Sequence, residues 1–213
     1  MTVNPAPPGS GTTGARPLWQ RSVIIMAAIT ALLFVIEAVD AAGDFRMDYR
    51  FGIISREVYG LDGIAWSPLL HADWAHLIGN LTVGVVLGFL LLLARRFLIV
   101  TAVVWIVSGV GVWLFGPSDT ATVGASGVIF GWLTYLLLRG LFNRNIWQIL
   151  GGLVLFAIYG SILWGVLPTD PTVSWQGHLF GAFGGVIAAW FLADRDRRKS
   201  KKAATQQFPG VRS

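Results

Sequence analysis

The sequence contains no cysteine, only three histidines and few charged residues, which make up 13% of its 213 positions. Without cysteine the chain cannot form a disulfide, a thiol nucleophile or a zinc–thiolate site. Hydrophobic residues make up 54% of the chain, and the mean hydropathy is +0.65. This composition excludes an ordinary soluble domain and predicts a membrane protein. The net charge of +5 does not indicate nucleic-acid binding, because the charges lie at the ends of apolar runs and not on one basic face.

Six apolar runs are each long enough to cross a bilayer as a helix. We therefore expect an all-α membrane domain of six transmembrane helices over residues 19–194. The preceding residues 1–18 are rich in Pro, Gly and Thr, which predicts a flexible cytoplasmic tail. The first run lacks a clear small-residue cleavage pattern, so we interpret it as a retained span and not as a signal peptide. The runs cover residues 21–41, 72–94, 97–115, 124–142, 146–167 and 175–193.

The basic residues are distributed asymmetrically along this pattern. All but three of the 16 Lys and Arg residues fall on one side of the predicted helices. The exceptions, Arg46, Arg50 and Arg56, lie in the long first loop together with several acidic residues. By the positive-inside rule, both termini are cytoplasmic and the number of helices is even. We interpret the basic segment 195–213 as a cytoplasmic tail that anchors this topology, in preference to a site for anionic lipid headgroups.

Polar side chains within apolar helices are costly, and each is therefore a functional candidate. His76 and Asn80 are four residues apart and project from one helix face near the outer end of the second run. Ser126 begins the fourth run and His178 lies about one turn inside the sixth, so all four share the outer half of the membrane. His71 is turned away from His76, and we expect it at the outer rim, in contact with headgroups or water.

Glycines accompany these polar residues at a spacing that allows close helix packing. The fourth run has a G-x-x-x-G ridge and the sixth run a double one. Facing ridges would bring His178 within hydrogen-bond reach of Ser126. Taken alone, the G-x-S-G sequence more often serves packing than chemistry, but four polar residues at one depth favour a site. The ridge glycines are Gly127 and Gly131 in the fourth run and Gly177, Gly181 and Gly185 in the sixth.

The combination supports acyl transfer. A histidine near pKa ~6.5 is suited to remove the proton of a serine hydroxyl. The Asn80 amide, a His76 ring N–H and the backbone N–H of Ser126 are candidate donors to an oxyanion. We expect Asp119 and Asp170 to be solvated loop residues, so the proposal is a Ser–His dyad. Glu37 and Asp40, at the outer end of the first run, are more simply interfacial residues than a proton or cation site.

These motifs resemble those of the rhomboid intramembrane serine proteases. The segment "HADWAHLIGN" is similar to the family's second-helix pattern, "GASG" to its nucleophile motif and "GHLFGAFGG" to its sixth-helix motif. The resemblance implies a six-helix core with a water-filled cavity that opens outward, and it implies no metal or cofactor. It implies Ser126 as nucleophile, His178 as general base and then acid, and His76 and Asn80 as oxyanion stabilisers.

The resemblance also implies the substrate and the setting. The substrate would be a transmembrane segment of another protein, cleaved near its outer end. The protein would be a multi-pass protein of a bacterial cell membrane, with its active site on the outer side. Two positions depart from the family: Phe130 stands where tyrosine is common, and Asp62 and Gly63 replace a Trp-Arg pair. A non-catalytic member that binds transmembrane segments is the alternative, and a transporter is disfavoured because no polar path reaches the inner face.

Overall fold

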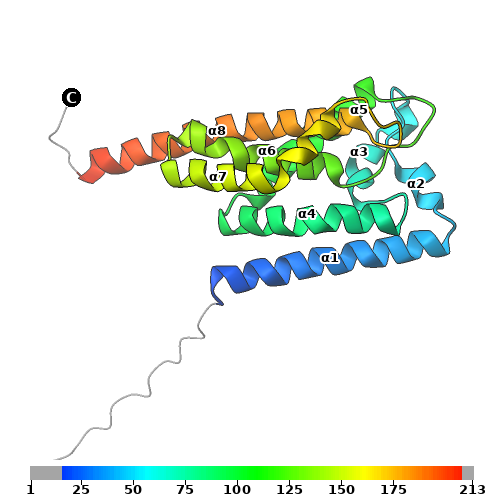
Figure 1. The fold of residues 1–213 in the computed structure, drawn as a ribbon, viewed down its shortest axis with the longest axis horizontal. Coiled ribbons are helices and arrows are strands. Elements are labelled where there is room, and N and C mark those ends of the chain that lie inside the picture. Colours follow the sequence, from blue (N-terminus) through cyan, green and yellow to red (C-terminus); the bar gives the residue numbers. More distant parts are fainter. Residues whose placement is uncertain (1–15, 208–213) are drawn as a thin grey trace, which may run out of the picture.

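The described chain is built mainly of long helices that lie side by side (Figure 1). The structure, a computed structural model, describes the backbone of residues 16–207 and the side chains of residues 16–193. Most of the predicted N-terminal tail and the side chains of the basic C-terminal tail lie outside these residues. Within them, five helices are long and apolar enough to cross a membrane. They are α1 (Leu18–Ala42), α4 (Trp74–Leu93), α5 (Phe97–Phe115), α7 with the 3₁₀-helix η3 (Ile146–Val166) and the first part of α8 (Trp175–Ala193).

The fourth apolar run forms α6 (Ser126–Asn143), which is not among these five. It begins with Ser126 and Gly127 and carries Arg139 near its end, so its mean hydropathy is lower. The helix packs against α4, α5, α7 and α8, and most of its side chains are buried in the protein. A helix surrounded by protein needs fewer apolar residues than one that faces lipid. The fourth run is therefore a helix as predicted, and its crossing of the membrane stays a prediction.

The ends of the helices differ from the predicted spans at two places. The predicted run 146–167 divides into α7 (Ile146–Tyr159) and η3 (Gly160–Val166). The helix α8 (Trp175–Gln207) continues past the predicted end at 193 into the basic segment. The start of α1 and the far end of α8 lie at the same end of the molecule (Figure 1), as an even number of crossings requires.

The long first loop forms a small layer across the opposite end. It contains α2 (Arg46–Phe51), η1 (Val58–Gly60), α3 (Gly63–Trp66) and η2 (Ser67–Leu69). Ile53 and Thr122 exchange two backbone hydrogen bonds of 2.9 Å, which join this loop to the segment before α6. The Ser55 hydroxyl donates to the Val112 carbonyl over 2.7 Å. Hydrogen bonds to backbone groups therefore fix the loop on the ends of α5 and α6.

Asp62 and Gly63, the positions that depart from the family pattern, both contribute to this layer. Asp62 forms a 3.3 Å ion pair with Arg50, which is exposed to solvent and contributes little to stability. Gly63 lies against the backbone of the preceding segment, where an added Cβ atom would come within 2.6 Å of the Ile53 nitrogen. The absence of a side chain at Gly63 is what allows the two backbones to touch.

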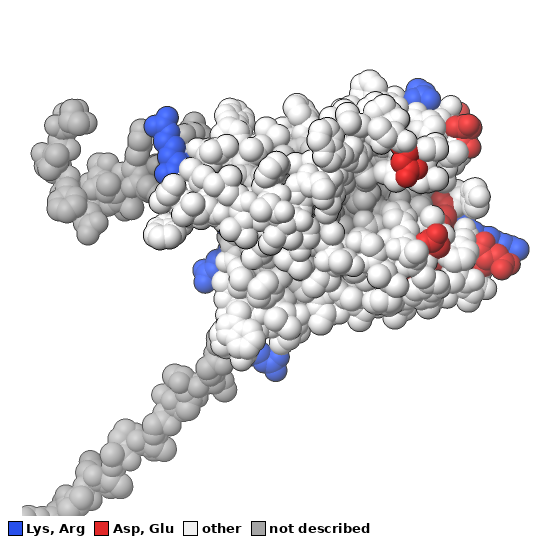
Figure 2. All heavy atoms as spheres, in the orientation of Figure 1, with Lys and Arg blue, Asp and Glu red and all other residues white. Residues whose placement is uncertain are grey.

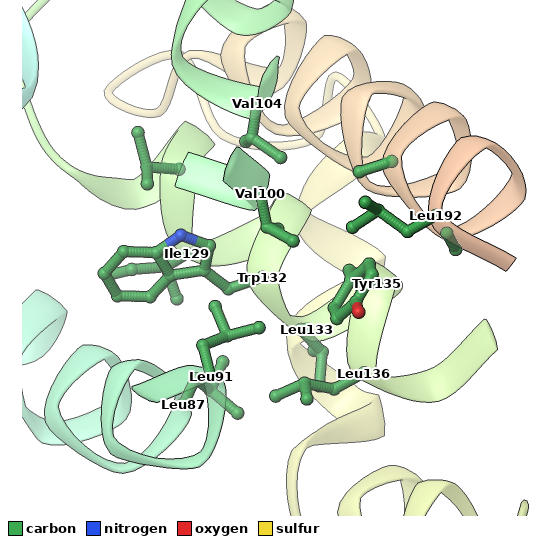
Figure 3. Packing of buried hydrophobic residues seen from close by; sticks show 13 residues of the cluster. Leu87, Leu91, Val100, Val104, Ile129, Trp132, Leu133, Tyr135, Leu136 and Leu192 are labelled. Atoms are coloured by element: carbon green, nitrogen blue, oxygen red, sulfur yellow. The ribbon is translucent and has the colours of Figure 1, made fainter. Parts of the chain in front are cut away.

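The helices pack around one buried apolar cluster between α4, α5, α6 and α8 (Figure 3). The glycine ridges of α6 and α8 face each other, as we hypothesised. A Cβ atom on Gly131 would lie 2.6 Å from the Gly181 carbonyl oxygen, and one on Gly185 would lie 3.0 Å from the Tyr135 nitrogen. Close backbone contact of this kind is a main source of helix association in membranes. The labelled residues of the cluster are Leu87, Leu91, Val100, Val104, Ile129, Trp132, Leu133, Tyr135, Leu136 and Leu192.

On the face of the molecule shown in Figure 2, the charged side chains lie at the two ends. On the face shown in Figure 2, the acidic side chains gather at the end that carries the first loop, and uncharged residues cover the broad surface between the ends. Many large apolar side chains of α1 and α7 are exposed on the outside of the bundle, including Val35, Leu153 and Phe156. Such an apolar belt is the surface expected of a protein surrounded by lipid.

Candidate active site

A cavity of about 490 Å³ opens beneath the first-loop layer. Its lining includes Ser126 from α6, His178 from α8, and His76 and Asn80 from α4. A second hollow of about 490 Å³ lies among the loops at the same end and shares His76 in its lining. The four residues predicted from three separate runs are thus brought to one cavity that continues toward the loops.

Ser126 is the first residue of α6, and a tight turn presents it to the cavity. Gly124 has φ +117°, a conformation that favours glycine, and a Cβ atom there would lie 2.6 Å from the His76 ring. The Gly124 N–H donates to the Ser67 carbonyl over 2.9 Å. At this helix start the first N–H groups have no partner within the helix and carry partial positive charge. The serine therefore stands where backbone donors are available to an anion.

His178 is buried, with 6% of its surface exposed, and its ring is held on two sides. The ring stacks on Phe130, with centroids 3.9 Å apart and an interplanar angle of 8°. The Nδ1 atom lies 2.9 Å from the Gly165 carbonyl oxygen. A carbonyl oxygen can only accept, so Nδ1 carries the proton in this hydrogen bond and Nε2 of the neutral ring is left as an acceptor. This is the tautomer that a general base requires.

Phe130 thus keeps the stacking contact without the tyrosine hydroxyl. Sequence reasoning missed the other partner of the histidine, Gly165, because the switch to a 3₁₀-helix at Gly160 has no clear sequence signal. A Cβ atom on Gly165 would lie 3.0 Å from both the Nδ1 atom of His178 and the Phe130 ring. Sequence reasoning also missed Ser108 of α5, whose hydroxyl donates to the Gly177 carbonyl over 2.9 Å and links α5 to the start of α8.

His76 and Asn80 lie on the cavity face of α4, as their spacing predicts. The helix is capped by Asp73, whose carboxylate accepts from the His76 N–H over 2.7 Å. Asp73 was identifiable in advance, because an aspartate directly before an apolar run is a typical N-cap. The amide nitrogen of Asn80 is buried and has no hydrogen-bond partner among the described residues. An unpaired buried donor on a cavity wall is unusual and is suited to bind an incoming acceptor.

The prediction that His71 is an interfacial residue is wrong. His71 is fully buried, and its ring meets His76 edge to face with centroids 5.2 Å apart. Its Nε2 atom accepts a long hydrogen bond of 3.5 Å from the Ala125 N–H, next to Ser126. Burial, with a smaller contribution from His76, lowers the pKa of His71 to about 4, so the ring is neutral and able to accept. His71 is buried because the residues directly before α4 fold beneath the first loop and do not extend to the membrane surface.

The prediction that Glu37 and Asp40 are interfacial is also wrong, because each is only 1% exposed. Asp119 and Asp170, in contrast, are exposed loop residues as predicted. The Thr172 N–H and hydroxyl donate to the Asp170 carboxylate and lower its pKa. Neither loop aspartate lines the cavity that contains Ser126.

Comparison with known proteins agrees with this architecture. The model of the Rhomboid domain matches residues 57–195, which is more than half of the chain. The chain belongs to the rhomboid family. Together with the five apolar helices, this makes it an integral membrane protein.

The relatives of this rhomboid include bacterial proteins that match nearly its whole length. It is 42% identical to the uncharacterized protein Rv1337 of Mycobacterium tuberculosis, over 100% of this chain and 90% of the relative. It is 44% identical to the uncharacterized protein ML1171 of Mycobacterium leprae, over 91% of this chain and 81% of the relative. A more distant relative, the putative rhomboid protease YdcA of Bacillus subtilis, is 28% identical over 83% of this chain and 91% of its own length.

Proposed function

We propose that this rhomboid is an intramembrane serine endopeptidase that uses Ser126 and His178 as a catalytic dyad. The observation that carries the proposal is the protonation of the His178 ring in the cavity that Ser126 also lines. Its Nδ1 proton is directed to the Gly165 carbonyl, and Nε2 is the ring nitrogen that remains to accept a proton. A serine at the start of a helix in the same cavity is the matching nucleophile.

The first chemical step is acylation. The Ser126 hydroxyl oxygen attacks the carbonyl carbon of the scissile peptide, and its proton passes to Nε2 of His178. The negative charge on the former carbonyl oxygen is stabilised by donors fixed before the reaction: the Asn80 amide, the His76 ring and the Ser126 N–H. The tetrahedral intermediate then releases the amine, which takes the proton from His178, and an acyl-enzyme ester remains on Ser126.

Hydrolysis completes the cycle. Water enters from the loop end of the cavity, loses a proton to His178 and attacks the ester carbonyl. The second tetrahedral intermediate collapses, Ser126 regains the proton from His178, and the carboxylic acid product leaves. The stacking of His178 on Phe130 keeps the ring in one orientation through both proton transfers.

The proposed substrate is a transmembrane segment of another protein, cut near the outer face of a bacterial cell membrane. Three features support this setting. The cavity is lined by residues of the first loop and of the helix ends beside it, and this end of the bundle lies opposite the start of α1 and the far end of α8 (Figure 1). Ala75 and Gly79 line the cavity and are also exposed on the outside of α4, so the cavity borders a surface that lipid would contact. The apolar belt around the helices suits a partner that shares the bilayer.

Active-site labelling tests the proposal directly. A fluorophosphonate probe should modify Ser126 in liposomes, and both Ser126→Ala and His178→Ala should remove the labelling and the cleavage of a model transmembrane substrate. Ser161→Ala, which changes an exposed serine of η3, is the matched control and should leave both intact. Cleavage by the Ser126→Ala variant at the wild-type rate would refute the mechanism. Binding of the substrate by the wild-type protein without labelling or cleavage would support a non-catalytic binding function instead.

A further inference from the structure

Three carboxyl groups are buried together at the first-loop end of α1, away from the proposed dyad. Glu37 and Asp40 lie near the end of α1, and Asp48 lies on α2. Their exposed fractions are 1%, 1% and 8%. The spacing of three residues places Glu37 and Asp40 on one face of the helix. Side chains of this type are almost never fully buried without a partner.

The hydrogen bonds of these groups leave part of each carboxyl unsatisfied. Asp40 accepts from the Met47 N–H over 2.9 Å through one oxygen. The other oxygen of Asp40 and one oxygen each of Glu37 and Asp48 are buried without a partner. Two ionised carboxylates cannot hydrogen-bond to each other, because both only accept. A proton on one of these carboxyls would supply the donor that the buried, unpartnered oxygens lack.

The surrounding charges make ionisation of the whole cluster unfavourable. Asp73, at the start of α4, adds negative potential at Glu37. The cations on α2, Arg46 and Arg50, are exposed, and Arg50 pairs with Asp62. Among the described side chains, no ion pair reaches any of the three buried carboxyls. Burying several like charges without a counterion is strongly unfavourable, so some of these groups take up a proton.

We propose that Glu37, Asp40 and Asp48 form a proton-binding site that holds α2 against the end of α1 while at least one shared proton is present. The pKa of Asp48, raised to about 7 by burial and then by Asp40 and Glu37, agrees with proton release near neutral pH. A shared proton accounts for the orphan oxygens better than a metal ion. In residues 16–193, no group of three His, Asp or Glu side chains is arranged to hold a metal.

Loss of the proton is expected to loosen α2 and the chain that follows it. With all three groups ionised, the carboxylates repel one another, and separation of α2 from α1 lets water reach the charges. The helix α1 also packs on α4, whose N-cap Asp73 binds the His76 N–H. An effect of pH on catalysis through the contact of α1 with α4 rests on the proposed function. Proton binding by the carboxyls and loosening of α2 do not depend on that function.

The test therefore uses two readouts that need no proteolytic activity. Infrared difference spectra of the intact protein in liposomes, taken between about pH 5 and about pH 9, should show loss of a protonated carboxylic acid band. Trypsin cleavage after Arg46 and Arg50 should accelerate over the same range, by up to about tenfold per pH unit for one linked proton.

Single substitutions test whether the infrared band and the change in trypsin cleavage arise from the three buried carboxyls. Asp48→Asn keeps the shape and supplies a permanent hydrogen-bond donor, so it should weaken the infrared band and make trypsin cleavage slow at every pH. Glu37→Gln should also reduce the band. Asp44→Asn is the matched control, because Asp44 is an exposed acid of the same loop, and it should behave as wild type. Absence of the band in the wild-type protein across this range, or an undiminished band in both cluster variants, would overturn the proposal. Acceleration of cleavage in Asp48→Asn equal to that of wild type would overturn it as well.

Discussion

Replacing Asn80 by alanine should slow catalysis without destabilising the protein. Most active-site residues also make contacts in the free enzyme, so their loss lowers activity and stability together. Asn80 is different, because its buried amide nitrogen has no partner among the described residues. The side chain borders an open cavity and not the packed core, so its truncation leaves no new void.

The expected effects of Asn80→Ala on kcat and on stability have opposite signs. Loss of one oxyanion donor reduces kcat by about 10²–10³, or about 2.7–4 kcal/mol of transition-state stabilisation. An unsatisfied buried polar group costs about 1–3 kcal/mol, and removing it returns part of that cost. We expect the Asn80→Ala variant to be at least as stable as wild type, with a gain on the order of 1 kcal/mol.

The assay combines kcat on a model transmembrane substrate in liposomes with thermal unfolding in detergent. Gln148→Ala provides the contrast. Gln148 lies near the start of α7, outside the lining of the cavity, and its amide oxygen accepts from Asn143 over 2.9 Å. Its loss should lower stability by about 1 kcal/mol and leave kcat unchanged. The reasoning is refuted if Asn80→Ala retains kcat within about threefold of wild type, which is well below the effect of an oxyanion donor, or if it loses as much stability as Gln148→Ala.

Two further variants test the cavity and the acidic cluster. Gly79→Leu should block the substrate and lower kcat/KM without loss of stability, because no atom lies within 4 Å of a Cβ atom at Gly79. The control is Gly151→Leu, which has equal space but lines a different pocket and should leave kcat/KM unchanged. Equal values of kcat/KM in the two variants would contradict this prediction. Burial raises the pKa of Asp48 from the ordinary aspartate value of 3.8 to about 7 in the folded chain. The stability that its proton provides is therefore complete below about pH 4 and is lost as the pH rises to about 7. The unfolding temperature of wild type should therefore fall over this range more steeply than that of Asp48→Asn, and parallel curves would exclude the titration of Asp48 as the cause.

The features that could be predicted from the sequence are those with a regular spacing. The period of the helix places His76 and Asn80 on one face, and the glycine ridges predict that α6 meets α8. The depth of each polar residue then follows from its distance to the end of its run. These regularities were sufficient to bring Ser126 and His178 to one cavity without any knowledge of the fold.

The errors concern residues whose surroundings are supplied by an irregular segment. His71, Glu37 and Asp40 were placed at the membrane surface because each lies at the end of an apolar run. The first loop covers all three, and its path depends on single hydrogen bonds such as that from Ser55 to Val112. Gly165 was missed for the same reason, since the 3₁₀ turn that directs its carbonyl to His178 has no periodic pattern.

The backbone contact between α6 and α8 has a consequence for how the lipid environment influences this protein. Ser126 and His178 are attached to two helices whose main chains touch at glycines, with no flexible side chains between them. Their separation is therefore determined by the van der Waals radii of backbone atoms, which do not vary with bilayer thickness or acyl-chain order. A change of lipid that alters turnover must then act on the delivery of the substrate or on the mobility of the first loop. Comparing probe labelling with substrate cleavage across bilayers separates these contributions, since the small probe reports on the dyad alone.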